Sequence, residues 1–343
     1  SPKMVEVARH PDITIHTCSE VESVAGEVGN FQVRVRKHPR YIIEEECNGC
    51  GDCTQICPVE VYNRFDAGIG VRKAIYKPHA QAVPDIVIKD QEHCIECGLC
   101  YDVCGREAIL TEDHERLIDI TAASIIVATG YGTFDARNKA HLRYLTIPDV
   151  ITSLEFERMI NASGPTGGEL RRLSNGKPPR SVAFIQCVGS RDISIGRPYC
   201  SGVCCMYAMK NAMLVREKDP GIKVTIFYND IRSYGKGYEE YYERAKSMGV
   251  RFVRGFPGEV LEENDHLMMV AENTETCEVE MFHPDLVVLS VGLGPARGAE
   301  EVSRMLGIPQ DETGFFKVAD QKVGPVLTVK PGIYVAGVAT APR

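Results

Sequence analysis

Residues 47–58 read CNGCGDCTQICP, and residues 94–105 read CIECGLCYDVCG. Both stretches space four cysteines as C-x2-C-x2-C-x3-C, and the first run ends at Pro58 where the second ends at Gly105. Three thiolates at this spacing lie on one tight loop and can bind three corners of a [4Fe–4S] cube, while the fourth lies beyond the loop and reaches another cube. The repeated run therefore predicts a region that holds two iron–sulfur clusters and moves electrons.

Because the fourth cysteine of each run binds the cube of the other run, two ligand sets follow. We predict one cluster on Cys47, Cys50, Cys53 and Cys104, and a second cluster on Cys94, Cys97, Cys100 and Cys57. The same run binds the clusters of two-cluster bacterial ferredoxins.

Two other uses of clustered cysteines fit the sequence less well. Disulfide frameworks are typical of small secreted domains, whereas this chain has 343 residues and no secretory signal at its start. Structural zinc usually takes C-x2-C pairs separated by a longer gap, without a third cysteine two residues further on. Iron–sulfur binding is therefore the favoured interpretation.

The bulk composition narrows the class of protein. A net charge of −8 argues against a general nucleic-acid surface, which would be basic. Apolar runs such as 124–128 and 286–291 are too short to cross a bilayer. The chain has 14 cysteines, and the reduced cytosol does not maintain structural disulfides, so most of them should be metal ligands or redox groups. We expect a cytoplasmic redox protein with no nucleic-acid or membrane partner.

Apolar patterning on either side of the cysteine-rich segment predicts β-structure. A short strand is expected at 13–17, and alternating apolar and charged residues predict a half-exposed strand at 31–36. The continuous apolar run 124–128 is typical of a fully buried strand in a parallel sheet. We therefore expect the cysteine-rich segment to be inserted into a sheet domain, not appended to one.

The remainder of the chain alternates predicted strands and helices. After a loop at 161–179, strands are predicted at 181–187, 223–228, 250–253 and 286–291, and helices at 203–218 and 238–248. This order predicts a doubly wound α/β domain.

A third group of cysteines follows the predicted strand at 181–187, and its members are Cys187, Cys200, Cys204 and Cys205. A dinucleotide-binding domain would place G-x-G-x-x-G at such a strand end, but residues 187–191 read CVGSR, which weakens direct NAD(P) binding. A third iron–sulfur cluster and a redox dithiol both fit the spacing. A purely structural alternative is that the thiols pack as small apolar groups.

Further motifs resemble the A subunit of heterodisulfide reductase, an electron-bifurcating iron–sulfur flavoprotein of methanogens and related anaerobes. The resemblance covers essentially the whole chain. Besides both cysteine runs, it rests on residues 1–4, 28–31, 185–192, 199–205, 234–239 and 332–337.

This resemblance implies an α/β, thioredoxin-reductase-like flavoprotein fold with an inserted two-cluster ferredoxin domain of α+β type. The implied parts are flavin-domain segments at 1–40, 116–165 and 291–343, the ferredoxin domain at 41–115, and a nucleotide-domain-like α/β unit at 180–290. In the family, cysteines matching the third group bind a [4Fe–4S] cluster. Three [4Fe–4S] clusters and one FAD are therefore expected.

Two strand ends resemble FAD-binding motifs of this superfamily. Ala128, Thr129 and Gly130 end one strand, and Ala336 and Gly337 end the last one. The alternative is that both are ordinary strand ends followed by turns.

The resemblance also suggests a lysine near the flavin ring, which would be Lys210. A positive charge there would stabilise an anionic reduced flavin. The alternative is a solvated helix lysine.

The chain departs from the family pattern at both ends. The family's flavin domain opens with a strand and a G-x-G-x-x-G loop, and this chain begins after that element and stops at Arg343 without a C-terminal ferredoxin domain. A flavin domain without its first βαβ unit would expose a sheet edge. We therefore expect a portion of a longer polypeptide, or a second chain that completes the domain.

By resemblance, the function is electron transfer in an oxidoreductase. A hydrogenase or formate dehydrogenase partner would supply electron pairs, which are split between ferredoxin and the heterodisulfide of coenzyme M and coenzyme B, reduced on a partner subunit. Other heterodisulfide reductase subunits would complete a hetero-oligomer with two copies of this chain. Two rivals are a non-catalytic wiring module and a pyridine-nucleotide-linked flavin disulfide reductase. The second would use Cys204 and Cys205, which form a strained ring if bridged.

Overall fold

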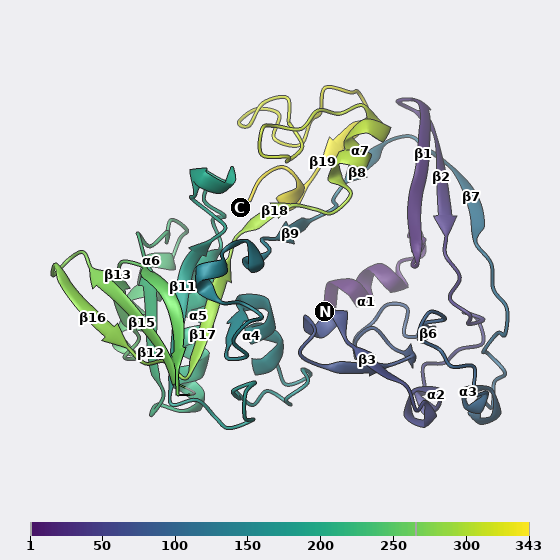
Figure 1. Cartoon of the computed structure of the whole chain (residues 1–343). Helices are drawn as coiled ribbons and strands as arrows, with labels where there is room; N and C mark the ends of the chain where they lie inside the picture. The colour runs from purple at the N-terminus through teal and green to yellow at the C-terminus, as the bar shows by residue number, and fades with distance from the viewer. Residues whose placement is uncertain (1, 265, 343) are drawn as a thin grey trace. The chain divides into compact units, whose positions relative to one another are not determined.

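In the computed structural model, residues 2–264 and 266–342 are described, and the chain divides into two compact units. Unit 1 comprises residues 1–124 and 163–165, and unit 2 comprises residues 125–162 and 166–343. Figure 1 traces the chain through both units. The domain bounds expected from the sequence stay predictions.

Unit 1 contains a three-stranded antiparallel sheet with the order β1–β2–β7. Its elements are helix α1 (Pro2–Arg9) and strands β1 (Ser19–Glu27), β2 (Asn30–Lys37) and β7 (Arg116–Ala122). The strand predicted at 31–36 is confirmed, whereas the strand predicted at 13–17 is wrong. Apolar patterning alone cannot make a strand there, because residues 13–17 have no strand beside them to pair with in the described structure.

The cysteine-rich region lies between β2 and β7, which pair directly, with Lys37 opposite Arg116. It contains two short helices, α2 (Asp52–Ile56) and α3 (Leu99–Val103), and two small antiparallel pairs. The pairs are β3 (Glu60–Tyr62) with β4 (Val71–Lys73) and β5 (Ile75–Tyr76) with β6 (Ile88–Lys89), and a 3-10 turn η1 spans Arg64–Asp66. The prediction of an insertion into a sheet is confirmed.

Unit 2 is built on a five-stranded parallel sheet with the order β10–β17–β11–β12–β13. The strands are β10 (Val150–Thr152), β11 (Ser181–Val188), β12 (Lys223–Tyr228), β13 (Arg251–Arg254) and β17 (Leu286–Val291). The helices are α4 (Ser153–Ile160), α5 (Cys204–Lys218) and α6 (Tyr238–Ser247). The strands and helices predicted in this part of the chain are confirmed to within one or two residues.

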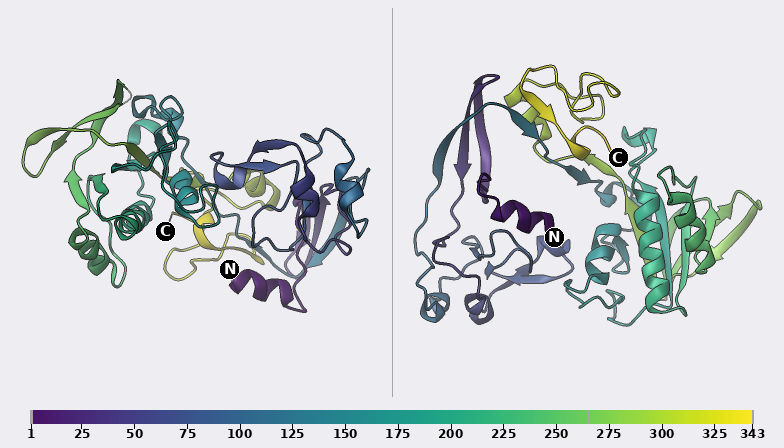
Figure 2. Two further views of the ribbon diagram at one scale, coloured as in Figure 1. Left: turned by 90° about the horizontal axis from the view of Figure 1, so that it is seen from below. Right: turned by 180° about the vertical axis from the view of Figure 1, so that it is seen from behind.

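The two faces of this sheet are covered differently. Helices α4 and α5 cover one face, where Phe156 packs edge-on against Phe184 at 5.3 Å between ring centroids, and α6 packs against α5 (Figure 2). The other face carries a three-stranded antiparallel sheet. Its strands are β14 (Pro257–Glu263), β15 (His266–Asn273) and β16 (Glu278–Phe282).

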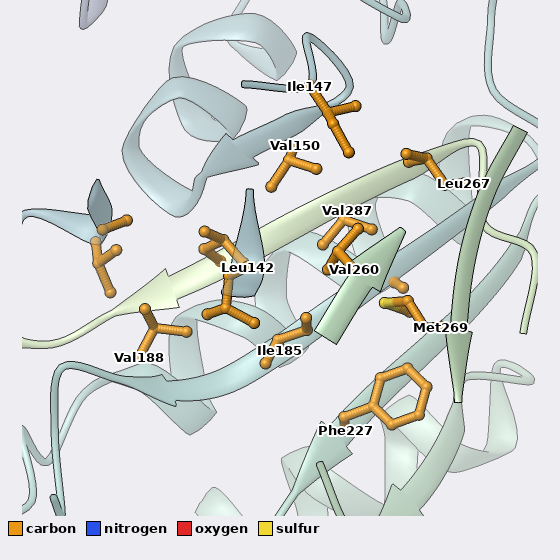
Figure 3. Close-up of a cluster of buried hydrophobic side chains, with 14 of the residues drawn as sticks. Leu142, Ile147, Val150, Ile185, Val188, Phe227, Val260, Leu267, Met269 and Val287 are labelled. Carbon is orange, nitrogen blue, oxygen red and sulfur yellow. The ribbon is translucent and has the colours of Figure 1, made fainter. Parts of the chain in front are cut away.

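The main core of unit 2 lies between these two sheets. Ile185 and Val287 of the parallel sheet pack with Val260 and Met269 of the antiparallel one, as Figure 3 shows. Side chains alternate along a strand, so Phe184 points to the helices and Ile185 to the second sheet. The doubly wound prediction is therefore wrong in this respect, because strands and not helices cover the second face.

A second group of short strands completes unit 2. β8 (Ile125–Val127) pairs in parallel with β19 (Ile333–Val335), and β9 (Tyr131–Thr133) pairs with β18 (Leu293–Pro295). Helix α7 spans Ala299–Leu306, and 3-10 turns span Ala136–Asn138 (η2), Ala140–Leu142 (η3), Ile193–Ile195 (η4) and Gly337–Ala339 (η5).

The strand expected at 124–128 is confirmed as a parallel strand, but its full burial is wrong. Ile126 is 67% exposed, because β8 has a single partner strand among the described residues. Within the described residues, no helix is both long and apolar enough to span a bilayer.

Candidate functional site

The two cysteine runs fold alike. Gly51 and Gly98 have φ of 91° and 84°, and each directly precedes a five-residue helix, α2 or α3. Two residues earlier, Gly49 and Glu96 also have positive φ, of 68° and 54°. Gly49 additionally allows a close approach, because a Cβ atom there would lie 2.2 Å from the carbonyl oxygen of Asp85. The sequence repeat is thus a repeat of loop conformation.

Each predicted ligand set lines one pocket. Cys47, Cys50, Cys53 and Cys104 line a cavity of about 320 Å³. Cys57, Cys94, Cys97 and Cys100 line a narrower one of about 20 Å³. The fourth cysteine of each run therefore lies with the first three of the other run, as the crossed assignment requires. Ligation itself stays a prediction.

The thiols of these pockets are part of the core of the region. Cys53 and Cys100 are buried and pack with a few apolar side chains, which are Ile42, Ile75, Val87 and Ile109. Burial raises the pKa of Cys53 to about 11. It also raises the pKa of Cys100, an effect that the nearby Lys89 ammonium opposes. Such thiols ionise at neutral pH only beside a cation, and bound metal deprotonates a coordinating thiol.

Backbone amides already point at two of the sulfurs. Glu96 N–H donates to Cys94 Sγ at 3.4 Å, and Ala108 N–H donates to Cys104 Sγ at 3.4 Å. Amide hydrogen bonds to sulfur are one of the levers that tune iron–sulfur potentials. The donor set therefore fits an iron–sulfur cluster.

The arrangement of the thiols can be compared with the two alternatives to iron–sulfur binding, which are a disulfide framework and structural zinc. All fourteen cysteines are free thiols. Among the described residues, the group of potential ligand atoms that converges within 4.8 Å is Asp90, Glu92 and His93, with no cysteine in it. Tetrahedral zinc with a Zn–S distance of about 2.3 Å needs sulfurs about 3.8 Å apart. No three cysteine sulfurs of the described residues lie within 4.8 Å of one another, so the thiols suit a multi-iron cube better than a single zinc ion.

Lys89 lies in the second pocket with Cys57, Cys94, Cys97 and Cys100, and it was not singled out in the sequence. Its side chain is 4% exposed, and Nζ donates to the Tyr101 hydroxyl at 2.8 Å. Burial acts to lower the pKa of Lys89. The hydrogen bond to Tyr101 and the nearby thiols outweigh that effect, so the pKa is raised. An alignment of the two cysteine runs by residue number would have drawn attention to this lysine.

The third group of cysteines gathers where β11 ends and α5 begins. Cys187 has a φ of 59°, and Gly189 two residues on has a φ of 77°. A Cβ atom at Gly189 would lie 2.0 Å from the Phe134 ring. The strand therefore turns sharply at Cys187, toward the loop that carries Cys200.

Hydrogen bonds fix that loop and its sulfurs. Buried Ser201 accepts from Leu293 N–H at 2.8 Å, and its own N–H donates to Ser190 Oγ at 3.0 Å. Gly202 N–H donates to Cys200 Sγ at 3.3 Å.

The four thiols of this group influence one another electrostatically. Cys204 interacts with Cys187, Cys205 and Cys200, and burial raises the pKa of Cys187 to about 11 and that of Cys204 to about 12. A redox dithiol needs an accessible, readily ionised sulfur, whereas Cys204 and Cys205 are 6% and 7% exposed. This environment fits a metal-bound set better than a dithiol.

The residues expected to contact FAD leave the same end of one strand pair. Val127 of β8 is opposite Val335 of β19, and Ala336 N–H donates to the carbonyl of Val127 at 2.9 Å. Ala128, Thr129 and Gly130 therefore emerge beside Ala336 and Gly337 at the carboxyl end of parallel strands, where α/β sheets bind ligands. After β19 the chain forms only a three-residue 3-10 turn.

Lys210, on α5, is paired with a carboxylate. Its Nζ donates to Glu157 Oε1 of α4 at 2.7 Å, and its side chain is 41% exposed. The partner Glu157 was not expected from the sequence, because the two residues are far apart in the chain. A role of Lys210 toward a flavin stays a prediction.

Comparison with known proteins begins with the cysteine-rich region. Residues 46–109 match the family model of the 4Fe-4S dicluster domain. The fold and this match define an iron–sulfur protein in which a dicluster domain is inserted into an α/β framework.

Curated relatives match the whole chain. It is 48% identical over 345 residues to the A subunit of the H(2):CoB-CoM heterodisulfide,ferredoxin reductase of Methanothermobacter marburgensis. It is 50% identical over 346 residues to an iron–sulfur A subunit of the CoB–CoM heterodisulfide reductase of Methanopyrus kandleri, the one numbered 2. These matches cover 100% of this chain and 52% and 53% of the relatives.

The family resemblance is thereby confirmed. Over its whole length the chain is homologous to the A subunits of the CoB–CoM heterodisulfide reductases, and it spans about half the length of the curated relatives it matches. Among solved structures, the T. acidophilum thioredoxin reductase is 14% identical with a TM-score of 0.40, covering 79% of this chain and 78% of that one.

Proposed function

We propose that this chain is the electron-transferring iron–sulfur flavoprotein part of a cytoplasmic CoB–CoM heterodisulfide reductase, an oxidoreductase. It would bind three [4Fe–4S] clusters and FAD. The observation that carries the proposal is the convergence of eight cysteines, in crossed sets of four, on two pockets of unit 1. Homology to the A subunits along the whole chain supports the same function.

The cysteines would supply every iron ligand of the three clusters. The two dicluster sets are the crossed quartets, and the third set is Cys187, Cys200, Cys204 and Cys205. Each cluster is a one-electron carrier whose potential is set by hydrogen bonds to sulfur, charge and solvent access. In this chain those levers are amide donors such as Glu96 and Gly202, the buried Lys89, and the low exposure of Cys204.

FAD would bind where β8 and β19 end. Backbone groups of Ala128, Thr129 and Gly130 and of Ala336 and Gly337 emerge there side by side. When bound, FAD would supply the exchange between electron pairs and single electrons. Lys210 would place positive charge near the ring, balanced by Glu157 when the flavin is oxidised.

The names of the relatives suggest the partners. One relative is the A subunit of an H2:CoB–CoM heterodisulfide,ferredoxin reductase. A second is named for H2 or formate and a third for ferredoxin or F420H2. We propose that a hydrogenase or formate dehydrogenase delivers electron pairs to this chain. One electron of each pair would pass to ferredoxin, and the other would pass to the heterodisulfide on another component of the reductase. The assembly would contain two copies of the chain.

Cluster and flavin content test this proposal directly. In the protein purified without oxygen, these 343 residues should account for about twelve irons and twelve sulfides, since each cube holds four of each, and for bound FAD. A Cys187→Ala variant should lose about four irons and keep the dicluster signals. Cluster absorbance without flavin would favour the wiring module. Flavin with an unmetallated third cysteine group would favour the disulfide reductase.

A further inference from the structure

The two halves of the dicluster region differ at one buried position. Cys94 lies 94 − 47 = 47 residues after Cys47, so the residue that matches Ile42 in the second half is Lys89. Ile42 is 3% exposed and Lys89 is 4% exposed. The same site in the repeat therefore holds an apolar side chain near one cluster pocket and an ammonium group in the other.

Among the described residues, no carboxylate pairs with the Lys89 ammonium. Its hydrogen bond goes to the neutral Tyr101 hydroxyl, and the Tyr41 and Tyr101 rings lie 5.3 and 5.2 Å from Nζ. In the part of the chain that the structure describes, no ion pair joins Lys89 to an acidic side chain. A buried charge without a counterion is strongly unfavourable, because burial removes its hydration.

The nearest acidic residue in sequence is used elsewhere. Asp90 binds Arg72 Nη2 at 2.5 Å and His93 Nδ1 at 3.0 Å. Successive side chains of an extended segment point to opposite sides, so Asp90 points away from Lys89. Glu96 is the one carboxylate among the residues that line the pocket of Lys89, and it is exposed and accepts from Gln91 Nε2 at 2.7 Å. The counterion that Lys89 lacks is therefore the cluster that the pocket would hold.

We propose that Lys89 is the counterion of the cluster bound by Cys57, Cys94, Cys97 and Cys100 and holds its reduction potential above that of the other dicluster cluster. This inference rests on the ligand sets of the proposed function. A cube with four thiolates is an anion and gains one more negative charge on reduction. A fixed positive charge in a low-dielectric pocket therefore favours the reduced form. An electron that enters the dicluster region would therefore reside mainly on the cluster near Lys89.

Potentiometric titration of the loaded full-length protein, followed by EPR, tests this. Lys89→Met keeps the volume and removes the charge, and Lys89→Gln also retains a group that can bind Tyr101. Both should make reduction of the higher-potential dicluster cluster at least tenfold less favourable, a fall of about 59 mV for one electron. The other cluster should keep its potential, and Lys89→Arg should restore most of the difference.

Lys73→Met is the matched control. Lys73 belongs to the same region, pairs with Glu60 at 3.0 Å and lines neither pocket, so its loss should leave both potentials in place. If both charge-removing variants retain two clusters with unmoved potentials, the role of Lys89 is overturned while the ligand sets stand. If the unmodified protein holds no pair of [4Fe–4S] clusters, the ligand sets fail, and this inference fails with them.

Discussion

At the scale of single residues, burial determines the protonation state of several cysteine thiols. Cys53, Cys187 and Cys204 have pKa values raised to about 11, 11 and 12, with burial as the leading cause. As free thiols they would be protonated and inert at neutral pH. These three buried thiols belong to the predicted ligand sets, and a bound metal would supply the positive charge that stabilises their thiolates.

The crossed ligand sets predict a specific pattern of iron loss. Cys57→Ser with Cys94→Ser affects one cluster, so the pair should cost about four irons per chain. Cys57→Ser with Cys47→Ser affects both clusters and should cost about eight. Iron and sulfide analysis of the two double variants, purified identically without oxygen, checks this. Equal losses from the two pairs would contradict the crossed assignment.

At the scale of elements, the turn after β11 places the third group of cysteines. Gly189→Ala would force a Cβ atom into the Phe134 ring at a positive φ. We expect this variant to lose about four irons per chain and the third cluster's EPR signal, with the dicluster signals retained. Gly196→Ala is the matched control, since Gly196 lies on the same loop at φ 69° with no atom within 4 Å of the added carbon. Equal cluster content in both variants would argue against a third cluster at this turn.

Asp113 ties together the segments that enter and leave the dicluster region. Its carboxylate accepts from the N–H groups of Arg40 at 2.8 Å and Tyr41 at 2.9 Å. Burial acts to raise the pKa of Asp113, but these bonds and a third from His114 lower it overall. The stabilisation is therefore fully present above the ordinary pKa of an aspartate and is lost as the pH falls from that value through the lowered pKa of Asp113.

Asp113→Asn should accordingly destabilise unit 1 by about 1–3 kcal/mol at pH 7, because two backbone donors lose a charged acceptor. The difference from the unmodified protein should shrink below about pH 4. Denaturant unfolding without oxygen at several pH values measures it. Glu112→Gln, at the exposed neighbouring position, controls for the loss of charge alone, and an equal effect in that variant would remove the special role of Asp113.

Elements whose signal is local were predictable from the sequence. The cysteine spacing led to both pockets, and buried apolar runs led to β11, β12 and β17. Features that depend on a distant partner were not. Residues 13–17 have strand-like residues but no strand to pair with, and the antiparallel sheet over Ile185 was not foreseen. Aligning the two cysteine runs places Lys89 at the position of Ile42, but only the fold shows that Lys89 is buried and that no described carboxylate pairs with it.

At the scale of the whole molecule, the two units depend on metal to different degrees. The core of unit 2 contains seventeen buried apolar residues between two sheets. The apolar cluster around the cysteines of the dicluster region contains only four buried apolar residues besides cysteine, which are Ile42, Ile75, Val87 and Ile109. Small domains with so little apolar core usually need a metal or disulfides to fold, and metal binding then supplies folding free energy.

Iron removal should therefore unfold one region and spare the other. After chelation under reducing conditions, amide exchange across residues 42–57 and 87–109 should accelerate roughly tenfold or more. Strands β11, β12 and β17 should stay protected, while the loop at 189–203 loosens because its cysteines lose their metal. Restoring iron and sulfide should restore protection, which separates metal loss from irreversible damage. Unchanged exchange at 87–109 in fully iron-free protein would show that the apolar residues alone stabilise this region, without metal bound to the thiols.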